Sequence, residues 1–131
     1  MSAPNDQVVI VTGGSSGIGR AAALSFAERG ARVLIIGRRA AALDEAAADH
    51  PNICGLVADA AAPDDAARTI ARAVDAWGRL DVLVNNAGAG AILPLADATA
   101  DRIISILAVN VLGPSLLAAA ALPHLARKGR S

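Results

Sequence analysis

The chain has 131 residues, of which 54% are hydrophobic and 33 are alanine, a length that suits one small domain and argues against two. Twelve basic and twelve acidic side chains cancel, which excludes the charged surface that binding to nucleic acid or to an anionic membrane requires. A single cysteine, Cys54, excludes an internal disulfide and every multi-cysteine metal site.

Short apolar runs alternate with helical patterns along the whole chain. We predict strands over residues 7–12, 32–36, 53–57 and 81–84. We predict helices over residues 15–29, 40–49 and 64–77, and a long one from Thr99, as the N-cap, to about Lys128. Four consecutive strand–helix units indicate right-handed crossovers and a Rossmann-like, doubly wound parallel α/β sheet. We expect one domain over residues 1–131, truncated after its fourth strand and the long helix, with strand order 3-2-1-4.

Two of these helices carry more specific expectations. In the helix over residues 64–77, the helical period places Ala67, Ile70, Ala71, Val74 and Trp77 inside. The same period places Asp65, Arg68, Arg72 and Asp75 outside, toward solvent. In the long helix, Pro114 lacks the N–H that would bond to the carbonyl of Asn110, so we expect a kink that leaves this carbonyl free to hold a water.

The long helix also has a second interpretation. Residues 103–126 contain no charged side chain and are followed by Arg127, Lys128 and Arg130, as a membrane-spanning segment would be. Three residues at its middle, Asn110, Gly113 and Pro114, fit an isolated span poorly. The rest of the chain favours a helix buried on two sides within a soluble fold.

A glycine-rich segment, Thr12-Gly13-Gly14-Ser15-Ser16-Gly17-Ile18-Gly19, ends the first predicted strand and begins the first helix. Glycines at positions 13, 17 and 19 allow a tight turn and bring backbone amides close to a pyrophosphate at the helix N-terminus. The alternative is a glycine-rich turn that binds nothing. Its place between a strand and a helix favours dinucleotide binding, with these candidate residues: Gly13, Ser15, Ser16, Gly17, Ile18 and Gly19.

The segment Asn85-Asn86-Ala87-Gly88 directly follows the fourth predicted strand. The carboxyl ends of parallel strands line the ligand crevice of such folds, so small residues here suit a cofactor that lies across the sheet edge. An ordinary asparagine–glycine turn explains the segment equally well.

Together these motifs resemble the short-chain dehydrogenase/reductase family. The order TGxxxGIG, an aspartate after the third strand (Asp59), NNAG, and VNVxG in a long helix over residues 109–113 follows that family from Gln7 to about Lys128. The resemblance implies an oxidoreductase that passes a hydride between NAD(P) and a carbonyl or an alcohol. It also implies a partner subunit packed against the helix over residues 100–127, and hence a homo-oligomer.

The resemblance assigns roles to individual residues. It implies that Asp59 holds the adenine amino group, with Ala60 supplying its backbone amide, and that Asn86, Ala87 and Gly88 lie near the nicotinamide ribose. It further implies that Asn110 is the asparagine of the catalytic tetrad, whose carbonyl holds a water of the proton relay. By themselves, Asp59 could be a loop residue that caps a helix and Asn110 a satisfied core asparagine.

The end of the second strand indicates which cofactor is preferred. NAD-specific sites place a carboxylate there to bind the ribose 2′-hydroxyl, whereas this chain has Gly37 followed by Arg38 and Arg39. Two guanidinium groups without a carboxylate suit a 2′-phosphate, so we expect NADP rather than NAD. Solvated loop charges are the alternative.

The sequence has no tyrosine, and its only lysine is Lys128. In the family, a serine and a YxxxK motif follow the long helix, whereas this sequence ends at Ser131. We therefore expect the N-terminal half of a roughly twice longer reductase, inactive alone because it offers no phenol as a general acid–base. A non-catalytic nucleotide-binding module, and a membrane-anchored or assembly protein, are the alternatives.

Location and partners complete these expectations. Residues 1–7 lack a signal-peptide pattern, which with the unpaired cysteine predicts a cytoplasmic protein. His50 and His124 stand in no arrangement that indicates a metal site. We expect a small carbonyl or alcohol as substrate, and neither nucleic acid nor a membrane as partner.

Overall fold

The computed structural model describes residues 7–88 and 94–126, and its elements follow the predicted order. The strands are β1 (Val8–Thr12), β2 (Arg32–Gly37), β3 (Ile53–Val57) and β4 (Val82–Val84). The helices are α1 (Gly17–Glu28), α2 (Ala40–Ala47), α3 (Pro63–Trp77), α4 (Ala100–Leu107) and α5 (Gly113–Ala126). All strand pairs are parallel and the strand order is β3-β2-β1-β4, as predicted.

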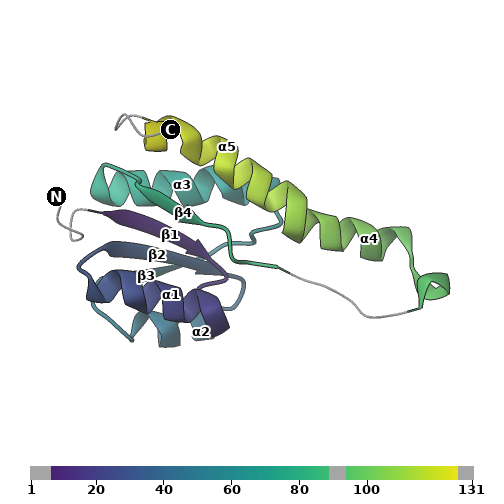
Figure 1. The fold of residues 1–131 in the computed structure, drawn as a ribbon, viewed down its shortest axis with the longest axis horizontal. Helices are drawn as coiled ribbons and strands as arrows, with labels where there is room; N and C mark the ends of the chain where they lie inside the picture. Colours follow the sequence, from purple (N-terminus) through teal and green to yellow (C-terminus); the bar gives the residue numbers. More distant parts are fainter. Residues whose placement is uncertain (1–6, 89–93, 127–131) are drawn as a thin grey trace.

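Helices cover both faces of the sheet, with α1 and α2 on one side and α3 and α5 on the other (Figure 1). The side chains of β1 alternate between the two layers: Val8 and Ile10 pack with α3 and α5, and Val9 and Val11 with α1 and α2. This strand is completely buried, which explains why its sequence is an unbroken apolar run. The helices meet the sheet largely through alanines, namely Ala23, Ala27, Ala46, Ala66, Ala73 and Ala121.

The inward face of α3 differs from the prediction. The buried residues are Ala66, Thr69, Ile70 and Ala73, whereas Ala67 and Ala71 are exposed. The buried face is therefore rotated toward Ala66 and Thr69, because the hydroxyl of Thr69 is satisfied by the carbonyl of Asp65 at 2.7 Å. Asp65, expected in solvent, is half-buried and hydrogen-bonded.

The long C-terminal helix is divided into three parts. It begins at the predicted N-cap, where Thr99 Oγ1 accepts from the N–H of Arg102 at 3.2 Å. A π-helical segment, Ala108–Leu112, separates α4 from α5, and the N–H of Gly113 donates to the carbonyl of Ala108, five residues back. The distortion expected at Pro114 thus takes the form of a π-helical segment just before the proline. A water on the Asn110 carbonyl remains a prediction, and Lys128 lies outside the described residues.

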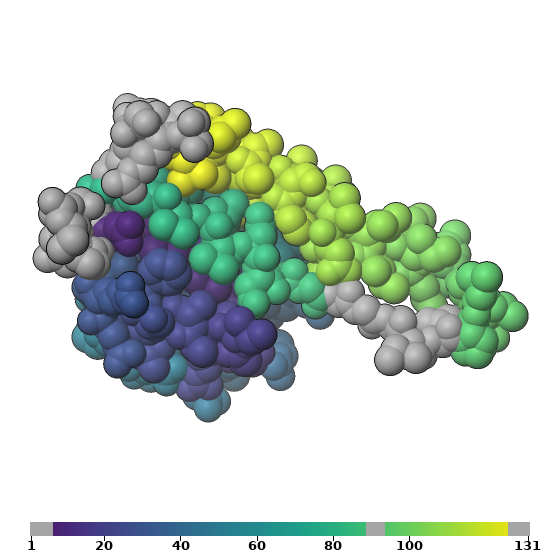
Figure 2. Space-filling view, in the orientation of Figure 1, coloured from purple at the N-terminus to yellow at the C-terminus, as the bar shows by residue number. Residues whose placement is uncertain are grey.

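Much of this long helix is uncovered. The segment Ala100–Leu125 is long and apolar enough to cross a membrane by length and composition alone, with a mean hydropathy of 2.1. Its most apolar window is only 11% buried, and α4 projects from the body of the molecule (Figure 2). Such a helix is weak evidence for a membrane, because core helices of soluble proteins have the same composition.

An exposed ion pair joins the two helices on one face of the sheet. Arg20 of α1 donates to both carboxylate oxygens of Asp49, just after α2, at 2.7 and 2.8 Å. These hydrogen bonds raise the pKa of Arg20 and lower that of Asp49. Because the carboxylate pKa is lowered, the stabilisation is present at neutral pH and is lost as the pH falls through that pKa.

The carboxylate of Asp81 ties the start of β1 to the start of β4. Its Oδ2 accepts from the N–H of Val8 at 2.8 Å, and its own N–H donates to the carbonyl of Val8 at 2.9 Å. Arg79 adds two hydrogen bonds to the same carboxylate, at 2.9 and 2.8 Å. Only 2% of the Asp81 side chain is exposed, and these hydrogen bonds satisfy its carboxylate oxygens away from solvent.

We therefore expect Asp81→Ala to lower the free energy of unfolding by about 2–3 kcal/mol, because a buried N–H and a guanidinium lose their acceptor. Urea unfolding followed by circular dichroism measures the change. Asp75→Ala, which removes an exposed carboxylate of α3, is the control and should change stability by less than about 0.5 kcal/mol. Equal losses in the two variants would contradict the role assigned to Asp81.

Candidate functional site

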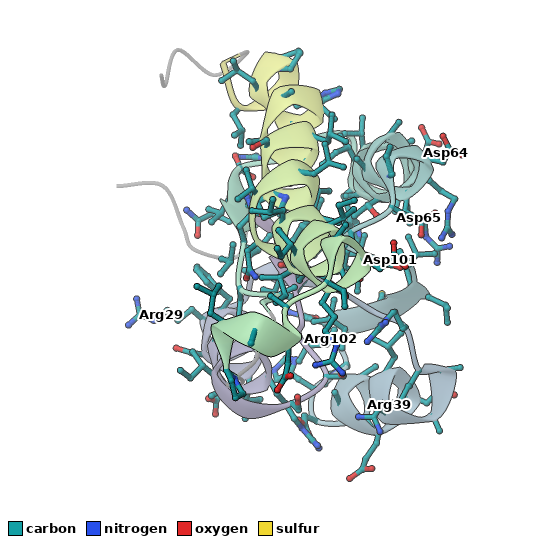
Figure 3. The ribbon with its side chains drawn as sticks, turned by 90° about the vertical axis from the view of Figure 1, so that its right-hand side faces the viewer. Arg29, Arg39, Asp64, Asp65, Asp101 and Arg102 are labelled. Atoms are coloured by element: carbon teal, nitrogen blue, oxygen red, sulfur yellow. The ribbon has the colours of Figure 1, made fainter. Side chains whose placement is uncertain are left out.

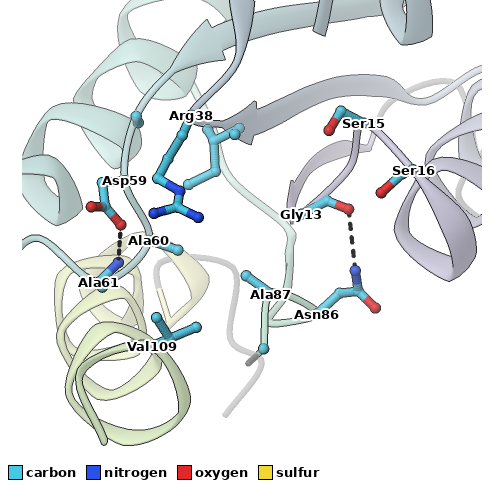
Figure 4. A pocket seen from close by; sticks show the side chains of 14 residues that line it. Gly13, Ser15, Ser16, Arg38, Asp59, Ala60, Ala61, Asn86, Ala87 and Val109 are labelled. Carbon is cyan, nitrogen blue, oxygen red and sulfur yellow. Dashed lines mark hydrogen bonds between the residues drawn. The ribbon is translucent and has the colours of Figure 1, made fainter. Parts of the chain in front are cut away.

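A cavity of about 310 Å³ lies where the carboxyl ends of the four strands meet. Figure 4 shows it between the glycine-rich loop, the loop after β3 and the loop after β4. Nine of the predicted cofactor-binding residues line it: Gly13, Ser15, Ser16, Arg38, Asp59, Ala60, Asn86, Ala87 and Gly88. The structure thus brings together three motifs that are far apart in the sequence.

The glycine-rich loop forms one wall and requires glycine at specific positions. Gly13 and Gly17 have φ angles of 63° and 56°, in the left-handed region that favours glycine. At Gly19, a Cβ would overlap the carbonyl oxygen of Gly13, so the first turn of α1 packs directly on the loop. The first amides of α1 have no intrahelical acceptor, and their partial positive charge suits a phosphate.

The hydroxyl of Thr12 joins this wall to the loop after β4. The Thr12 side chain is buried, and its Oγ1 accepts from the N–H groups of Asn86 and Ala87, both at 2.9 Å. The same hydroxyl lies 3.4 Å from the carbonyl of Val84, to which it donates. Asn86 Nδ2 then donates to the carbonyl of Gly13 at 3.3 Å, drawn as a dashed line in Figure 4. These bonds fix the width of the cavity on the β1–β4 side.

The opposite wall is the loop after β3. Asp59 Oδ1 accepts from the N–H of Ala61 at 2.8 Å, which holds the loop in a tight turn (Figure 4). The N–H of Asp59 donates to Asp65 Oδ2 at 2.7 Å. That hydrogen bond is the main reason why the pKa of Asp65 lies below its usual value, and Arg68 lowers it further. Asp65 is therefore a carboxylate near neutral pH, fixed beneath the cavity wall.

The end of β2 supplies the remaining side of the cavity. Arg38 extends from β2 toward Asp59 and Ala60 (Figure 4). Its guanidinium makes no ion pair with the carboxylates of residues 7–88 and 94–126, so it is available to a ligand. Gly37 precedes it, and a Cβ there would lie in ordinary contact with Ser15 Oγ and Leu43. Arg39 is exposed and does not line the cavity.

Four more predicted residues, Gly17, Ile18, Gly19 and Asn110, also lie beside the cavity rather than in its lining. Ile18 is 81% exposed at the start of α1, next to Gly17 and Gly19. Asn110 lies in the π-helical segment, where its Nδ2 donates to the carbonyl of Ile106 at 2.9 Å. A Cβ added to Gly88 would lie 3.1 Å from Asn110 Oδ1, so this amide adjoins the NNAG loop.

The π-helical segment contacts the cavity wall closely. A Cβ at Gly113 would overlap the carbonyl oxygen of Ala60, which requires glycine at the start of α5. Asn85 Nδ2 donates to the carbonyl of Pro114 at 3.3 Å, and Val109 lines the cavity. The π-helical segment, the NNAG loop and the loop after β3 are therefore in direct contact with one another.

Some residues of the site were not predicted from the sequence. Val109 and Ala61 line the cavity without carrying a polar side chain that could mark them. Asp65 is the third such residue, since helical periodicity predicts it in solvent. The signal that could have found it is Pro63 at the first helical position with an acidic residue two positions later, a pattern in which the carboxylate can accept from a backbone N–H that precedes the helix. Within the part of the chain that the structure describes, no cluster of three or more metal-ligating side chains occurs.

Comparisons with known proteins agree with this geometry. The family model described as short chain dehydrogenase matches residues 7–131. A protein of Streptomyces violaceoruber, named as a ketoacyl reductase of the granaticin polyketide synthase, is 44% identical and is matched over 97% of this chain and 53% of its own length. Glucose 1-dehydrogenase of Gluconobacter oxydans is 40% identical, over 82% of this chain and 42% of its own.

A solved metagenomic short-chain oxidoreductase in complex with NADP superposes with a TM-score of 0.93 at 32% identity, covering 99% of this chain and 61% of that one. A 3-ketoacyl-(acyl-carrier-protein) reductase from Brucella melitensis, complexed with NADH, superposes with a TM-score of 0.89 at 30% identity, covering 94% and 51%. The chain belongs to the short-chain dehydrogenase family and has its cofactor-binding Rossmann fold. It spans about half the length of the curated relatives it matches.

The role of the Thr12 hydroxyl in holding the loop after β4 can be tested directly. We expect Thr12→Val to lower the free energy of unfolding by about 2–3 kcal/mol, because the N–H of Ala87 loses its acceptor and that of Asn86 keeps only the carbonyl of Val84, while the side-chain shape is kept. Thr12→Ser, which keeps the hydroxyl, should lose less than about 1 kcal/mol. Urea unfolding of the three proteins measures the difference, and similar losses in both variants would show that the hydroxyl does not hold the loop.

Proposed function

We propose that this chain provides the cofactor-binding half of an NADP-dependent oxidoreductase that transfers a hydride between NADP(H) and a carbonyl or an alcohol. The observation that carries this proposal is the cavity at the strand ends, walled by the glycine-rich loop, Asp59 and Asn86. Its position matches the crevice in which doubly wound folds bind dinucleotides. Membership of the family supports the reaction class.

The residues present fit the cofactor at each of its parts. The glycine-rich loop leaves no room for a Cβ at Gly19, and it offers the amides of α1 to the pyrophosphate. At the β3 side, Asp59 Oδ2 and the N–H of Ala60 have no hydrogen-bond partner among residues 7–88 and 94–126. An acceptor beside a donor suits the amino group and ring nitrogen of adenine.

The preference for NADP rests on the end of β2. Gly37 offers no carboxylate to a ribose 2′-hydroxyl, and the guanidinium of Arg38, which pairs with no carboxylate of the described residues, lines the cavity next to it. A guanidinium binds a phosphate through two parallel charged hydrogen bonds. Arg39, which is exposed and does not line the cavity, supplies only a positive potential in this proposal.

Bound NADP(H) supplies or accepts the hydride, and the chain positions the nicotinamide half. Asn86, Ala87 and Gly88 form the cavity wall at β4, held in place by Thr12. Asn110, in the π-helical segment, lies next to Gly88. We propose that it takes part in a proton relay from this position. The substrate is a small carbonyl or alcohol.

Assembly and location are also proposals. We infer a cytoplasmic homo-oligomer that associates through α4 and α5. The apolar side chains of that surface are half or more exposed at Ile103, Ile104, Leu107 and Val111, more than a soluble monomer ordinarily leaves uncovered on one helix.

A non-catalytic nucleotide-binding module is the second candidate function. The observation in its favour is that Asn110 directs its amide nitrogen to its own helix, at the carbonyl of Ile106, rather than into the cavity. The printed sequence also contains no tyrosine. Binding without turnover in a form that carries the family's YxxxK motif would support this candidate.

The cofactor preference is tested by Arg38→Ala. We expect unmutated chain to bind NADPH about ten- to hundredfold more tightly than NADH, since a charged hydrogen bond contributes about 1.5–3 kcal/mol, and Arg38→Ala to remove this difference. Gly37→Asp, whose Cβ would lie in ordinary contact with Ser15 and Leu43, should favour NADH instead. Fluorescence titration measures both affinities. Arg29→Ala, an exposed arginine at the end of α1, controls for net charge, and equal affinity of the unmutated chain for both cofactors would contradict the preference.

The 131 residues alone should bind NADPH without oxidising it. No phenol is present to donate the proton, and positioned acid–base groups commonly contribute about 10²–10⁴-fold to the rate. Absorbance at the NADPH band, followed with a panel of ketones and aldehydes, measures turnover. Oxidation by the purified chain above the buffer rate would require a different catalytic group and would refute this expectation.

A further inference from the structure

We propose that Asp65, held by Arg68, is a positioning residue that sets the adenine subsite by fixing the backbone of residues 57–61. The inference rests on the proposed function, because it concerns the wall of the same cavity. It assigns a role to two α3 side chains that do not line the cavity themselves.

The network has two anchor points on one short segment. Asp65 Oδ2 accepts from the N–H of Asp59 at 2.7 Å. Asp65 Oδ1 accepts from Arg68 Nε at 3.3 Å and from Arg68 Nη2 at 3.2 Å. Arg68 Nη2 also donates to the carbonyl of Val57, the last residue of β3, at 2.7 Å. The first turns of α3 therefore hold both the end of the strand and the residue that faces the cofactor.

This anchoring determines what Asp59 presents to the cavity. Its N–H is bound by Asp65, its carbonyl accepts from the N–H of Ala62 at 3.0 Å, and its Oδ1 accepts from the N–H of Ala61. With these groups occupied, the segment is fixed on three sides, and the N–H of Ala60 and Asp59 Oδ2 are left for a ligand. A rotation of the Asp59 peptide would move both groups together.

Asp64 provides a matched comparison within the same helical turn. Both carboxylates belong to the first turn of α3, so both interact favourably with the positive end of the helix. The carboxylate of Asp64 is exposed and makes no hydrogen bond within the described ranges, whereas only 23% of the Asp65 side chain is exposed. Figure 3 shows the two side by side at this end of α3. Charge and dipole are thus equal in the two positions, and the hydrogen bond to Asp59 distinguishes them.

The test measures recognition of the adenine amino group. The probes are NADPH and deamino-NADPH, in which a carbonyl replaces that amino group, and affinities are obtained by fluorescence titration of the full chain. We expect unmutated chain and Asp64→Asn to bind NADPH about tenfold more tightly than deamino-NADPH. Asp65→Asn should reduce this ratio to about two, because its neutral amide holds Arg68 and Asp59 less well. A loss of general stability would weaken both probes alike and leave the ratio unchanged.

A second measurement does not depend on the cofactor. Amide hydrogen exchange of the unliganded chain should be about tenfold faster at Asp59 in Asp65→Asn than in Asp64→Asn. Arg68→Lys, which keeps the charge but cannot hold Asp65 and Val57 together, should act in the same direction and serves if Asp65→Asn does not fold. Unchanged exchange at Asp59 and an unchanged ratio would overturn the positioning role alone. No binding of either nucleotide by the unmutated chain, with exchange altered as expected, would overturn the proposed function and leave the network intact.

Discussion

The buried hydroxyl of Thr12 is the contact on which the rest of the site depends. Thr12 is the last residue of β1, and its oxygen accepts from the N–H groups of Asn86 and Ala87 in the loop after β4. β1 and β4 pair over only three positions, so without this oxygen the two loops could separate where the ladder ends. A single side chain thereby holds the end of β1 and the loop after β4 together as one wall of the cavity, with the glycine-rich turn on one side and Asn86 on the other.

The same principle, polar contacts at the strand ends, operates at both edges of the sheet. Asp81 connects the start of β4 to the start of β1, and Arg68 connects the end of β3 to α3. Between these ends the core is apolar and is filled by β-branched strand residues against helix alanines. Alanine allows a helix to approach the sheet closely, as Ala23 and Ala27 of α1 do where they pack in the cluster of Val9 and Val11. The apolar core thus sets the distances between the helices and the sheet, and the polar contacts set the orientation of the loops at the strand ends.

The strands, their order and most of the cavity lining followed from the sequence because they depend on local patterns. An unbroken apolar run such as VVIVT and glycines between a strand and a helix each have one common structural meaning. The inward face of α3 did not follow, because alanine is equally suited to both faces and the position of Thr69 depends on a hydrogen bond to Asp65. The role of Asp65 was missed for the same reason: periodicity treats a carboxylate as a solvent residue, whereas its partner lies in a loop six positions earlier.

The long apolar helix shows how packing resolves what composition leaves open. Length and hydropathy would allow Ala100–Leu125 to cross a membrane, yet Leu117 and Ala121 are fully buried in the core cluster of Val8 and Ile10. Gly113 also lies against the carbonyl of Ala60, in the wall of the cavity. Moving this helix into a bilayer would expose one face of the sheet and dismantle the cavity that the rest of the chain builds. The buried stripe on α5 therefore makes this part of the helix a component of the core beneath the sheet, whereas the apolar stripe on α4 is uncovered.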